Sequence, residues 1–314
     1  MFIKNKEVIN GKEAVTVSGL GKVSLTDTLE CGQAFRYERL SDDDGLIKYL
    51  VTVADSLITV GQRTAGELIF FDLTDEELHS VAQAFFSFST DFEAIREDIL
   101  SRTDSEWLAK AAECAAGVTI LSQDPWETLV SFIISQNNNI PRIRKIIRMI
   151  CAEYGENLAA KRFDFCPLGK INGIPCEENC KNCGICYTFP TPRDILERPE
   201  GLLPSRPGFR YKYILDAAKK VDSGEINLED IKRHGSYEYT VSELKKILGV
   251  GDKVASCVAL FGFGNLEAFP IDVWIKRAID LYFDGSLDPK SLGSYAGVAQ
   301  QYIFHYLRNL DTEK

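Results

Sequence analysis

A lysine and an aspartate carry the most distinctive chemistry in this sequence. Lys253 follows the tight turn LGVGD, and Asp272 lies nineteen positions later in PIDVW. An unperturbed lysine amine, with a pKa of about 10.4, is only about one part in a thousand neutral near pH 7.5, so a nucleophilic lysine needs surroundings that disfavour its charge. The two groups could converge on one cleft, where the neutral amine could attack a sugar carbon or an iminium-like centre. Lys253 as a phosphate contact and Asp272 as a plain helix cap are the simpler alternatives.

The turn before Lys253 has the composition of a phosphate-binding hairpin. Gly249 and Gly251 permit positive φ and leave backbone amides uncovered, and we expect Asp252 to cap the following helix. Bare amides beside a helix N-terminus attract phosphate. The pattern predicts a helix-hairpin-helix at about residues 238–262, although GVG turns also occur in unrelated helical hairpins.

Two further helices are expected upstream. Asp124 and Pro125 form a helix start, and this helix should end at Gln136. Three asparagines follow before Pro141 opens a second helix. Its positions Arg144, Lys145 and Arg148 share one face without an acidic residue. A solvated face and a phosphate-facing surface explain this basic stripe equally well.

The fold class expected is α+β. The first seventy or so residues are rich in β-formers separated by turn signals, which predicts an antiparallel sheet. From Thr74, which pairs with Glu77 as a capping box, the apolar pattern becomes helical. We therefore predict an N-terminal sheet domain with flanking helices over residues 1–115, followed by a mainly α-helical region over residues 116–314.

Composition and charge limit the possible functions. The chain has 36 Lys plus Arg against 46 Asp plus Glu, a net charge of −10, so any anionic partner must be met locally rather than by overall charge. The sequence contains no HExxH helix, GxxxxGK[ST] phosphate loop or GxSxG elbow. We read no membrane span or secretion signal, and expect a cytoplasmic protein, a monomer, with no membrane partner.

Four segments resemble 8-oxoguanine DNA glycosylases. The segment LGVGDKVASCVALFGF with AFPIDVW resembles the core of helix-hairpin-helix glycosylases that carry both lysine and aspartate. The other three segments, CGQAFRY, SFIISQNNNIPRI and YAGVAQQYIF, are similar to the 8-oxoguanine family, and together they span most of the chain. The resemblance implies a TATA-binding-protein-like N-terminal sheet and a glycosylase with lyase activity on duplex DNA containing 8-oxoguanine. It implies no cofactor for catalysis.

The resemblance also implies roles for individual residues. Lys253 would attack C1′ and form a Schiff base that permits β-elimination, while Asp272 would stabilise positive charge on the sugar. The residues that match the base pocket are Gly32, Cys257, Gln300 and Phe304. The residues that match contacts to DNA and to the orphaned partner base are Asn137, Arg142, Phe209, Arg210, Gly249 and Gly251. Phe209 stands where the family pattern has tyrosine, which leaves an apolar wedge but no hydroxyl contact.

Two competing functions fit parts of the pattern. One is another base-excision glycosylase of the same fold, such as an enzyme for alkylated purines, which generally lacks the lysine and releases the base with water. The other is a non-catalytic helix-hairpin-helix DNA-binding protein in which Lys253 only touches phosphate. Borohydride trapping of a covalent complex with DNA separates these alternatives.

A cysteine-rich insertion at residues 166–186 departs from the family pattern. Cys176, Cys180, Cys183 and Cys186 lie close enough to hold a tetrahedral Zn²⁺ ion. The segment CKNCGIC is also similar to an iron–sulfur ligand loop, and free thiols are the third alternative. We expect a structural zinc ion or, less favourably, an iron–sulfur cluster that rigidifies the insertion near the DNA.

Overall fold

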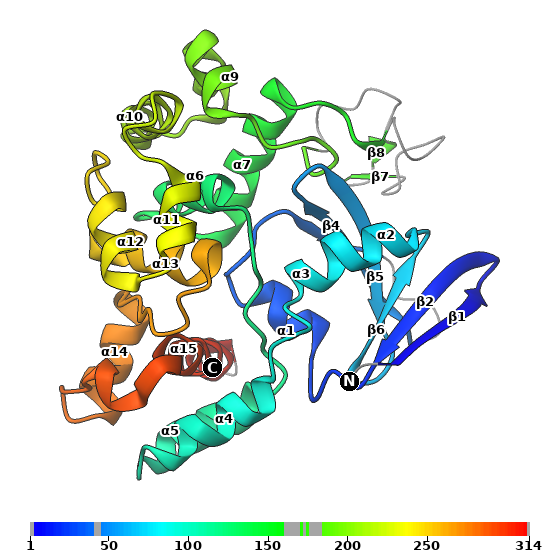
Figure 1. Ribbon diagram of the computed structural model, residues 1–314, viewed down its shortest axis with the longest axis vertical. Helices are drawn as coiled ribbons and strands as arrows, with labels where there is room; N and C mark the ends of the chain where they lie inside the picture. The colour runs from blue at the N-terminus through cyan, green and yellow to red at the C-terminus, as the bar shows by residue number, and fades with distance from the viewer. Residues whose placement is uncertain (1–2, 41–44, 160–169, 172–173, 176–183, 313–314) are drawn as a thin grey trace.

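The computed structural model describes residues 3–40, 45–159, 170–171, 174–175 and 184–312 of the 314 residues. Figure 1 shows a sheet formed by the first part of the chain on one side and a cluster of helices on the other. This arrangement confirms the α+β class and the N-terminal antiparallel sheet.

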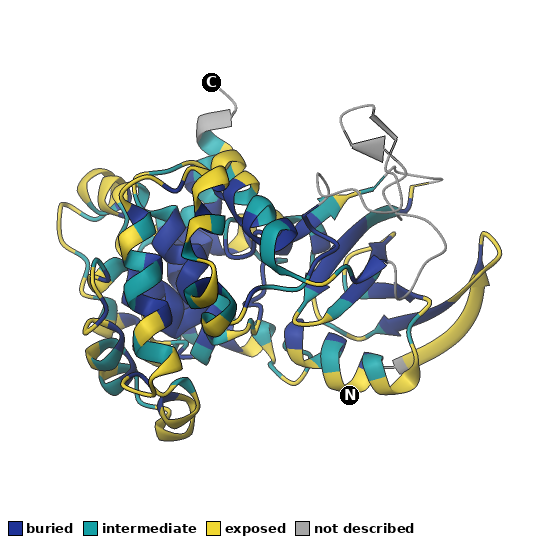
Figure 2. Cartoon of the chain, turned by 90° about the horizontal axis from the view of Figure 1, so that it is seen from above, coloured by how far each residue is buried: buried dark blue, intermediate teal, exposed yellow. Residues whose placement is uncertain are grey.

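Six antiparallel strands form the sheet, in the order β1-β2-β6-β5-β4-β3. Their bounds are β1 Ile3–Ile9, β2 Lys12–Ser18, β3 Tyr37–Arg39, β4 Ile47–Val53, β5 Ser56–Gln62 and β6 Glu67–Phe71. The central strands are buried along most of their length, whereas β1 is an exposed edge strand (Figure 2). Covering helices must therefore shield the middle of the sheet.

Short helices cover one face of the sheet. They are α1 Leu25–Glu30, α2 Asp75–Glu77, the π-helical turn η1 Leu78–Ala82, and α3 Gln83–Phe85. Thr74 and Glu77 form the predicted capping box. Leu29, Leu78 and Phe85 pack with the inward residues of the strands in one apolar core.

The remaining helices form a second and larger core. Their bounds are α4 Phe92–Ser101, α5 Glu106–Cys114, α6 Pro125–Ser135, α7 Ile140–Tyr154, α9 Pro192–Glu197, α10 Arg210–Asp222, α11 Leu228–His234, α12 Tyr237–Leu244, α13 Asp252–Phe263, α14 Val273–Tyr282 and α15 Ala296–Thr312. Two 3-10 turns, η2 Pro199–Ser205 and η3 Pro289–Tyr295, lie between them. Strands β7 Lys170–Ile171 and β8 Ile174–Pro175 form a separate small hairpin. Helix α6 begins after its N-cap Asp124 and ends at its C-cap Gln136, which confirms both predicted ends of this helix. Within the described residues, no helix is both long enough and apolar enough to cross a bilayer.

Helices α4 and α5 pack with the helical region. Both contact α15, beneath which they lie in Figure 1, and Ile95, Ile99 and Leu108 belong to the helical core. The domain boundary near residue 115 stays a prediction. On the basis of this packing, we propose that the sheet unit ends before Phe92.

The basic stripe of α7 holds the sheet against the helices. Arg144 and Arg148 both donate to the carbonyl of Tyr37 and pair with the Glu38 carboxylate, and the Arg144 guanidinium lies 4.1 Å from the centre of the Tyr37 ring. For these two arginines, neither a solvated face nor a phosphate-facing surface describes the structure. Only Lys145 of the stripe is exposed.

A buried ion pair makes a second connection between the two regions. Arg36, which is 3% exposed, donates through Nη1 to Glu127 Oε2 at 2.7 Å and through Nη2 to the Tyr187 carbonyl. Arg36 follows the loop after α1, whereas Glu127 lies in the first turn of α6. The pair therefore fixes this loop to the helix.

The Glu127→Ala variant should be less stable than the wild-type protein by about 3–5 kcal/mol, because it leaves the Arg36 charge buried and unpaired. Urea denaturation monitored by circular dichroism measures this change. The double variant Arg36→Met, Glu127→Leu should recover part of the loss, because no charge remains unpaired. A Glu127→Ala midpoint equal to that of the wild type would contradict this assignment of the pair.

Candidate active site

One pocket of about 1010 Å³ lies between the end of α1, the α6–α7 loop and the starts of α13 and α14, with α15 along one wall. It brings together most of the residues singled out in the sequence. The predicted site residues that line it are Gly32, Asn137, Arg142, Phe209, Gly251, Lys253, Cys257, Asp272, Gln300 and Phe304. Gly249 and Arg210 lie outside its lining.

Lys253 lies in the first turn of α13. Its Nζ is 3.3 Å from Ser135 Oγ and 5.2 Å from the centre of the Phe132 ring. The expectation that Asp252 caps this helix is wrong: Gly251 is the N-cap and has no side chain to accept a bond, while Asp252 pairs with Lys245 Nζ at 2.5 Å. The amides at the start of α13 are consequently left open toward the pocket.

Asp272 caps α14, as the sequence predicts. Its Oδ1 accepts from the amides of Trp274 at 3.0 Å and Ile275 at 2.9 Å. Both bonds go to the same oxygen, so within the described chain Oδ2 has no hydrogen-bond partner. The cap thus holds a carboxylate at the pocket wall and leaves one oxygen for another group.

Cys257 lies one helical turn after Lys253 and is 4% exposed. Burial raises the pKa of the Cys257 thiol above its ordinary value, and the charge of Lys253 offsets only part of that effect. The thiol is therefore neutral near pH 7 and serves as a compact, weakly polar wall of the pocket.

Gly32 contributes main chain to the pocket lining. Its φ is +87°, and a Cβ there would lie 3.3 Å from Ile140 Cδ1 and 3.6 Å from Phe304 Cε1. A side chain would thus strain the backbone and narrow the space beside Phe304.

The loop that carries Gly32 is fixed by its neighbour, Gln33. This fully buried side chain donates to the carbonyl of Thr119 at 2.7 Å and accepts from the amide of Leu121 at 2.8 Å. The main-chain walls of the pocket are therefore set by buried hydrogen bonds.

Phe209 and Asn137 both belong to the pocket lining. Phe209 is 49% exposed, and Asn137 has a left-handed φ of 52°. Arg210 is 3% exposed, and its guanidinium donates to the carbonyls of Gln136, Asn137 and Pro207. The buried Arg210 side chain therefore holds the main chain of the α6–α7 loop through the carbonyls of Gln136 and Asn137. Its contact with a partner base stays a prediction.

The hairpin before Lys253 leaves two amides open. The amide of Leu248 donates to Asp216 and that of Val250 to the Ile247 carbonyl, whereas those of Gly249 and Gly251 have no partner among the described residues. Gly249 has a φ of +78°, and a Cβ there would lie 2.4 Å from the Tyr213 ring. Only glycine fits this position.

The predicted metal site cannot be traced as a whole. Cys176, Cys180 and Cys183 lie outside the described residues, and Cys186 is buried. Among the residues that the structure describes, no three His, Cys, Asp or Glu side chains come together in a way that could hold a metal ion. Zinc and iron–sulfur binding at this cluster stay predictions.

Comparison with known proteins identifies the family. Residues 17–129 match the model of the 8-oxoguanine DNA glycosylase N-terminal domain. The structure of MBOgg1 in complex with a low-affinity DNA ligand is 34% identical, covers 98% of this chain and 99% of its own, and has a TM-score of 0.79. The Clostridium acetobutylicum 8-oxoguanine glycosylase/lyase, in complex with DNA containing cytosine opposite 8-oxoG, is 31% identical, with coverages of 99% and 98% and a TM-score of 0.78. The chain belongs to the 8-oxoguanine DNA glycosylase family.

A curated relative extends the similarity to eukaryotes. The N-glycosylase/DNA lyase of Saccharomyces cerevisiae is 28% identical over 286 residues, which are 85% of this chain and 69% of the yeast protein. Similarity to the 8-oxoguanine DNA glycosylase family therefore covers the sheet and the helices alike.

Sequence reasoning missed several residues of this glycosylase pocket. Ser135, Gln301 and Arg308 all line it. Gln301 directly follows a predicted base-reading residue and Arg308 lies one turn beyond Phe304, so helical spacing alone could have suggested both. Ser135 could not be found this way, because its partner Lys253 is 118 positions away.

Two glycine variants test the hairpin. Gly249→Ala should lower the free energy of unfolding by about 1–3 kcal/mol, since the new methyl group meets Tyr213 and the residue requires positive φ. Gly251→Ala is the matched control, because a Cβ there has nothing within 4 Å and φ is ordinary. Thermal unfolding of both variants measures the difference, and equal melting temperatures would show that the hairpin tolerates either substitution.

Proposed function

We propose that the protein excises 8-oxoguanine from duplex DNA and cleaves the strand at the abasic site that remains. The observation that carries this function is the meeting of Lys253 and Asp272 in one pocket beside Gln300 and Phe304. The relatives whose names describe N-glycosylase/DNA lyase and 8-oxoguanine glycosylase/lyase activities support it.

The substrate base must first leave the helix. A base stacked in duplex DNA is out of reach of both catalytic side chains, and its extrusion costs a few kcal/mol. The pocket of about 1010 Å³ has room for a purine and its sugar. Phe209, exposed at the mouth, supplies an apolar ring that can enter the opened step, and Asn137 can occupy the vacated space.

Base release follows from the positions of the two groups. Lys253 Nζ first gives up a proton to solvent. Its lone pair then forms a bond to C1′ as the bond from C1′ to N9 breaks, and the electron pair of the broken bond leaves with the base, which takes up a proton from solvent. Positive charge develops on the sugar in this step. The carboxylate of Asp272 stabilises that charge, since its Oδ2 is not used by the helix cap.

Strand cleavage uses the same covalent bond. Opening of the sugar ring converts the C1′ adduct into a protonated Schiff base, which acidifies the C2′ hydrogens. Loss of a C2′ proton and departure of the 3′ phosphate oxygen complete the β-elimination, and water then frees Lys253. Every step uses groups of the protein, the DNA and water, so a catalytic cofactor is not needed.

Recognition of the base combines stacking with polar contacts. The ring of Phe304 can stack on the extruded purine, and the Gln300 amide can bond to its Watson–Crick edge. The carbonyl of Gly32 can accept the N7 hydrogen that 8-oxoguanine has and guanine lacks. An unsatisfied carbonyl costs only about 1–3 kcal/mol, so discrimination must also draw on extrusion and catalytic alignment.

Phosphate binding does not require a basic surface. The open amides of Gly249 and Gly251 and the N-terminus of α13 can hold a phosphate beside Lys253. A chain of net charge −10 can therefore bind DNA at one place.

Three expectations from the sequence stay predictions. They are a monomer, a cytoplasmic location, and a structural metal at Cys176, Cys180, Cys183 and Cys186. Light scattering measures the first, and elemental analysis of the purified protein measures the third.

The Lys253→Gln variant should bind a duplex containing 8-oxoguanine but lose borohydride trapping and strand cleavage, because no amine remains to join the sugar. Gel shift and trapping assays measure the two effects. Lys12→Gln, a change in strand β2 outside the pocket, is the control and should be trapped like the wild type.

The same assays separate the competing functions. Base release without trapping by the wild-type protein would support a glycosylase that uses water, and binding alone would support a non-catalytic DNA-binding protein. Normal strand cleavage by Lys253→Gln would show that another group is the nucleophile.

The Gln300→Ala variant should excise 8-oxoguanine about 5- to 150-fold more slowly, because an amide contact in a buried pocket is worth about 1–3 kcal/mol. Cleavage of a preformed abasic site should fall much less, since that substrate has no base to read. Single-turnover rates on the two substrates measure the difference, and an equal loss on both would contradict a base-reading role.

A further inference from the structure

A second glutamine lies directly behind Gln300. Gln301 is 5% exposed and Gln300 is 3% exposed, and both line the pocket from α15. Gln301 Nε2 donates to Gln300 Oε1 at 2.7 Å. The Gln300 amide is thus held by the amide of its neighbour.

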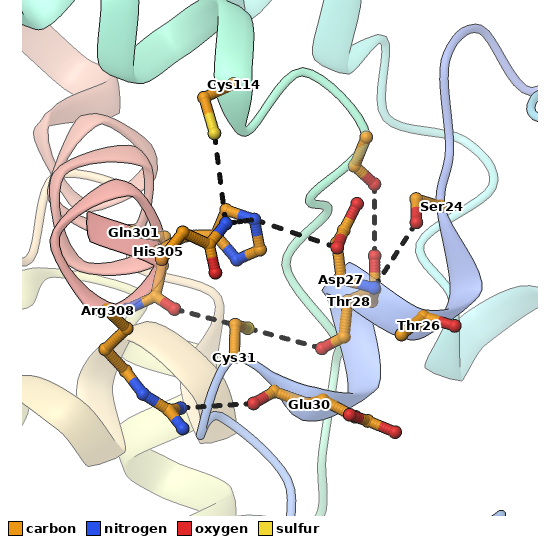
Figure 3. Close-up of polar contacts among 12 residues, drawn as sticks. Ser24, Thr26, Asp27, Thr28, Glu30, Cys31, Cys114, Gln301, His305 and Arg308 are labelled. Atoms are coloured by element: carbon orange, nitrogen blue, oxygen red, sulfur yellow. Dashed lines mark hydrogen bonds and ion pairs between the residues drawn. The ribbon is translucent and has the colours of Figure 1, made fainter. Parts of the chain in front are cut away.

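The other end of Gln301 is held by Cys31. Gln301 Oε1 accepts from the Cys31 thiol at 3.6 Å, and Figure 3 shows the two side chains pointing toward each other from α15 and from the end of α1. Burial raises the pKa of Cys31 to about 11, so the thiol keeps its hydrogen near pH 7. Its sulfur in turn accepts from Gln33 Nε2 at 3.3 Å.

Cys31 has a single hydrogen to donate, and two acceptors lie within its reach: the Thr28 carbonyl at 3.3 Å and Gln301 Oε1 at 3.6 Å. The Thr28 carbonyl also accepts from Gln33 Nε2 at 2.9 Å. When Cys31 donates to Gln301, the bonds run in one direction, from Gln33 to Cys31, from Cys31 to Gln301 and from Gln301 to Gln300.

This direction matters because an amide can be turned over without changing its shape. A purine with O6 presents an acceptor followed by the N1 hydrogen, whereas a purine with a 6-amino group presents a donor followed by an acceptor at N1. Gln300 can match the first order in one orientation and the second in the other. Its neighbour decides which orientation is the stable one.

We propose that Gln301, fixed by Cys31, is a positioning residue that locks the Gln300 amide in the orientation complementary to a 6-oxopurine and so rejects 6-aminopurines. This inference rests on the proposed function, because it assigns a source of specificity to the same pocket. A hydrogen bond of this kind favours one orientation by a factor of about two to ten.

Excision of two lesions by two variants tests the proposal. The probes are matched duplexes that contain 8-oxoguanine or 8-oxoadenine, and each single-turnover rate is normalised to cleavage of a preformed abasic site. Gln301→Met keeps the volume but cannot hold the amide. The ratio of 8-oxoguanine to 8-oxoadenine excision should fall about fivefold.

Gln301→Glu gives a sharper result. A carboxylate can only accept, so it must bind Gln300 Nε2 and turn the amide over. The ratio should then fall further than in Gln301→Met. Cys31→Ser, which retains a donor, should keep a ratio close to that of the wild type, whereas Cys31→Ala should lower it.

The outcomes are distinguishable. Equal loss on both lesions in both Gln301 variants would overturn the proposal, because it would show a purely structural role. If the Gln301 variants do not fold, the pair Cys31→Ser and Cys31→Ala decides it, and identical ratios in these two would also overturn it. A wild-type protein that cleaves abasic sites but excises neither lesion would instead refute the proposed function.

Discussion

Two helix N-termini directed into the same pocket are the constraint on which this structure depends. The start of α13 places an amine there and the start of α14 places a carboxylate. The position of each group is set by the backbone at the start of its helix. Because the amides at a helix start carry partial positive charge, they favour phosphate and carboxylate. The glycine N-cap of α13 keeps that potential uncovered, whereas the aspartate cap of α14 uses it to hold the acid in place.

The parts of the site governed by local rules could be predicted from the sequence. The Asp272 cap, the Asp124 start of α6 and the neighbouring positions of Gln300 and Phe304 depend on residues within a few positions of one another. The sequence predicts Asp252 as the cap of α13 because aspartate is a common N-cap residue. In the structure the Asp252 carboxylate pairs instead with Lys245, which lies at the C-terminal end of α12.

Long-range contacts account for what the sequence did not reveal. Arg144 and Arg148 meet a carbonyl more than a hundred positions earlier, and Arg210 meets carbonyls 73 and 74 positions earlier. An arginine in solvent and one that satisfies buried carbonyls have the same spacing along a helix. Their difference lies in tertiary packing, which a single sequence does not display. The same reason hides the connection from Gln33 to Gln300, whose members come from two separate parts of the chain.

Arg210 has a mechanical consequence for the opening of the pocket. Its guanidinium lies 4.5 Å from the centre of the Phe209 ring and donates to the carbonyl of Asn137, so a single planar cation contacts both the exposed ring and the asparagine loop. Because this one rigid cation contacts both groups, the exposed ring and the asparagine loop share a support, and displacing either one alters the packing of the other.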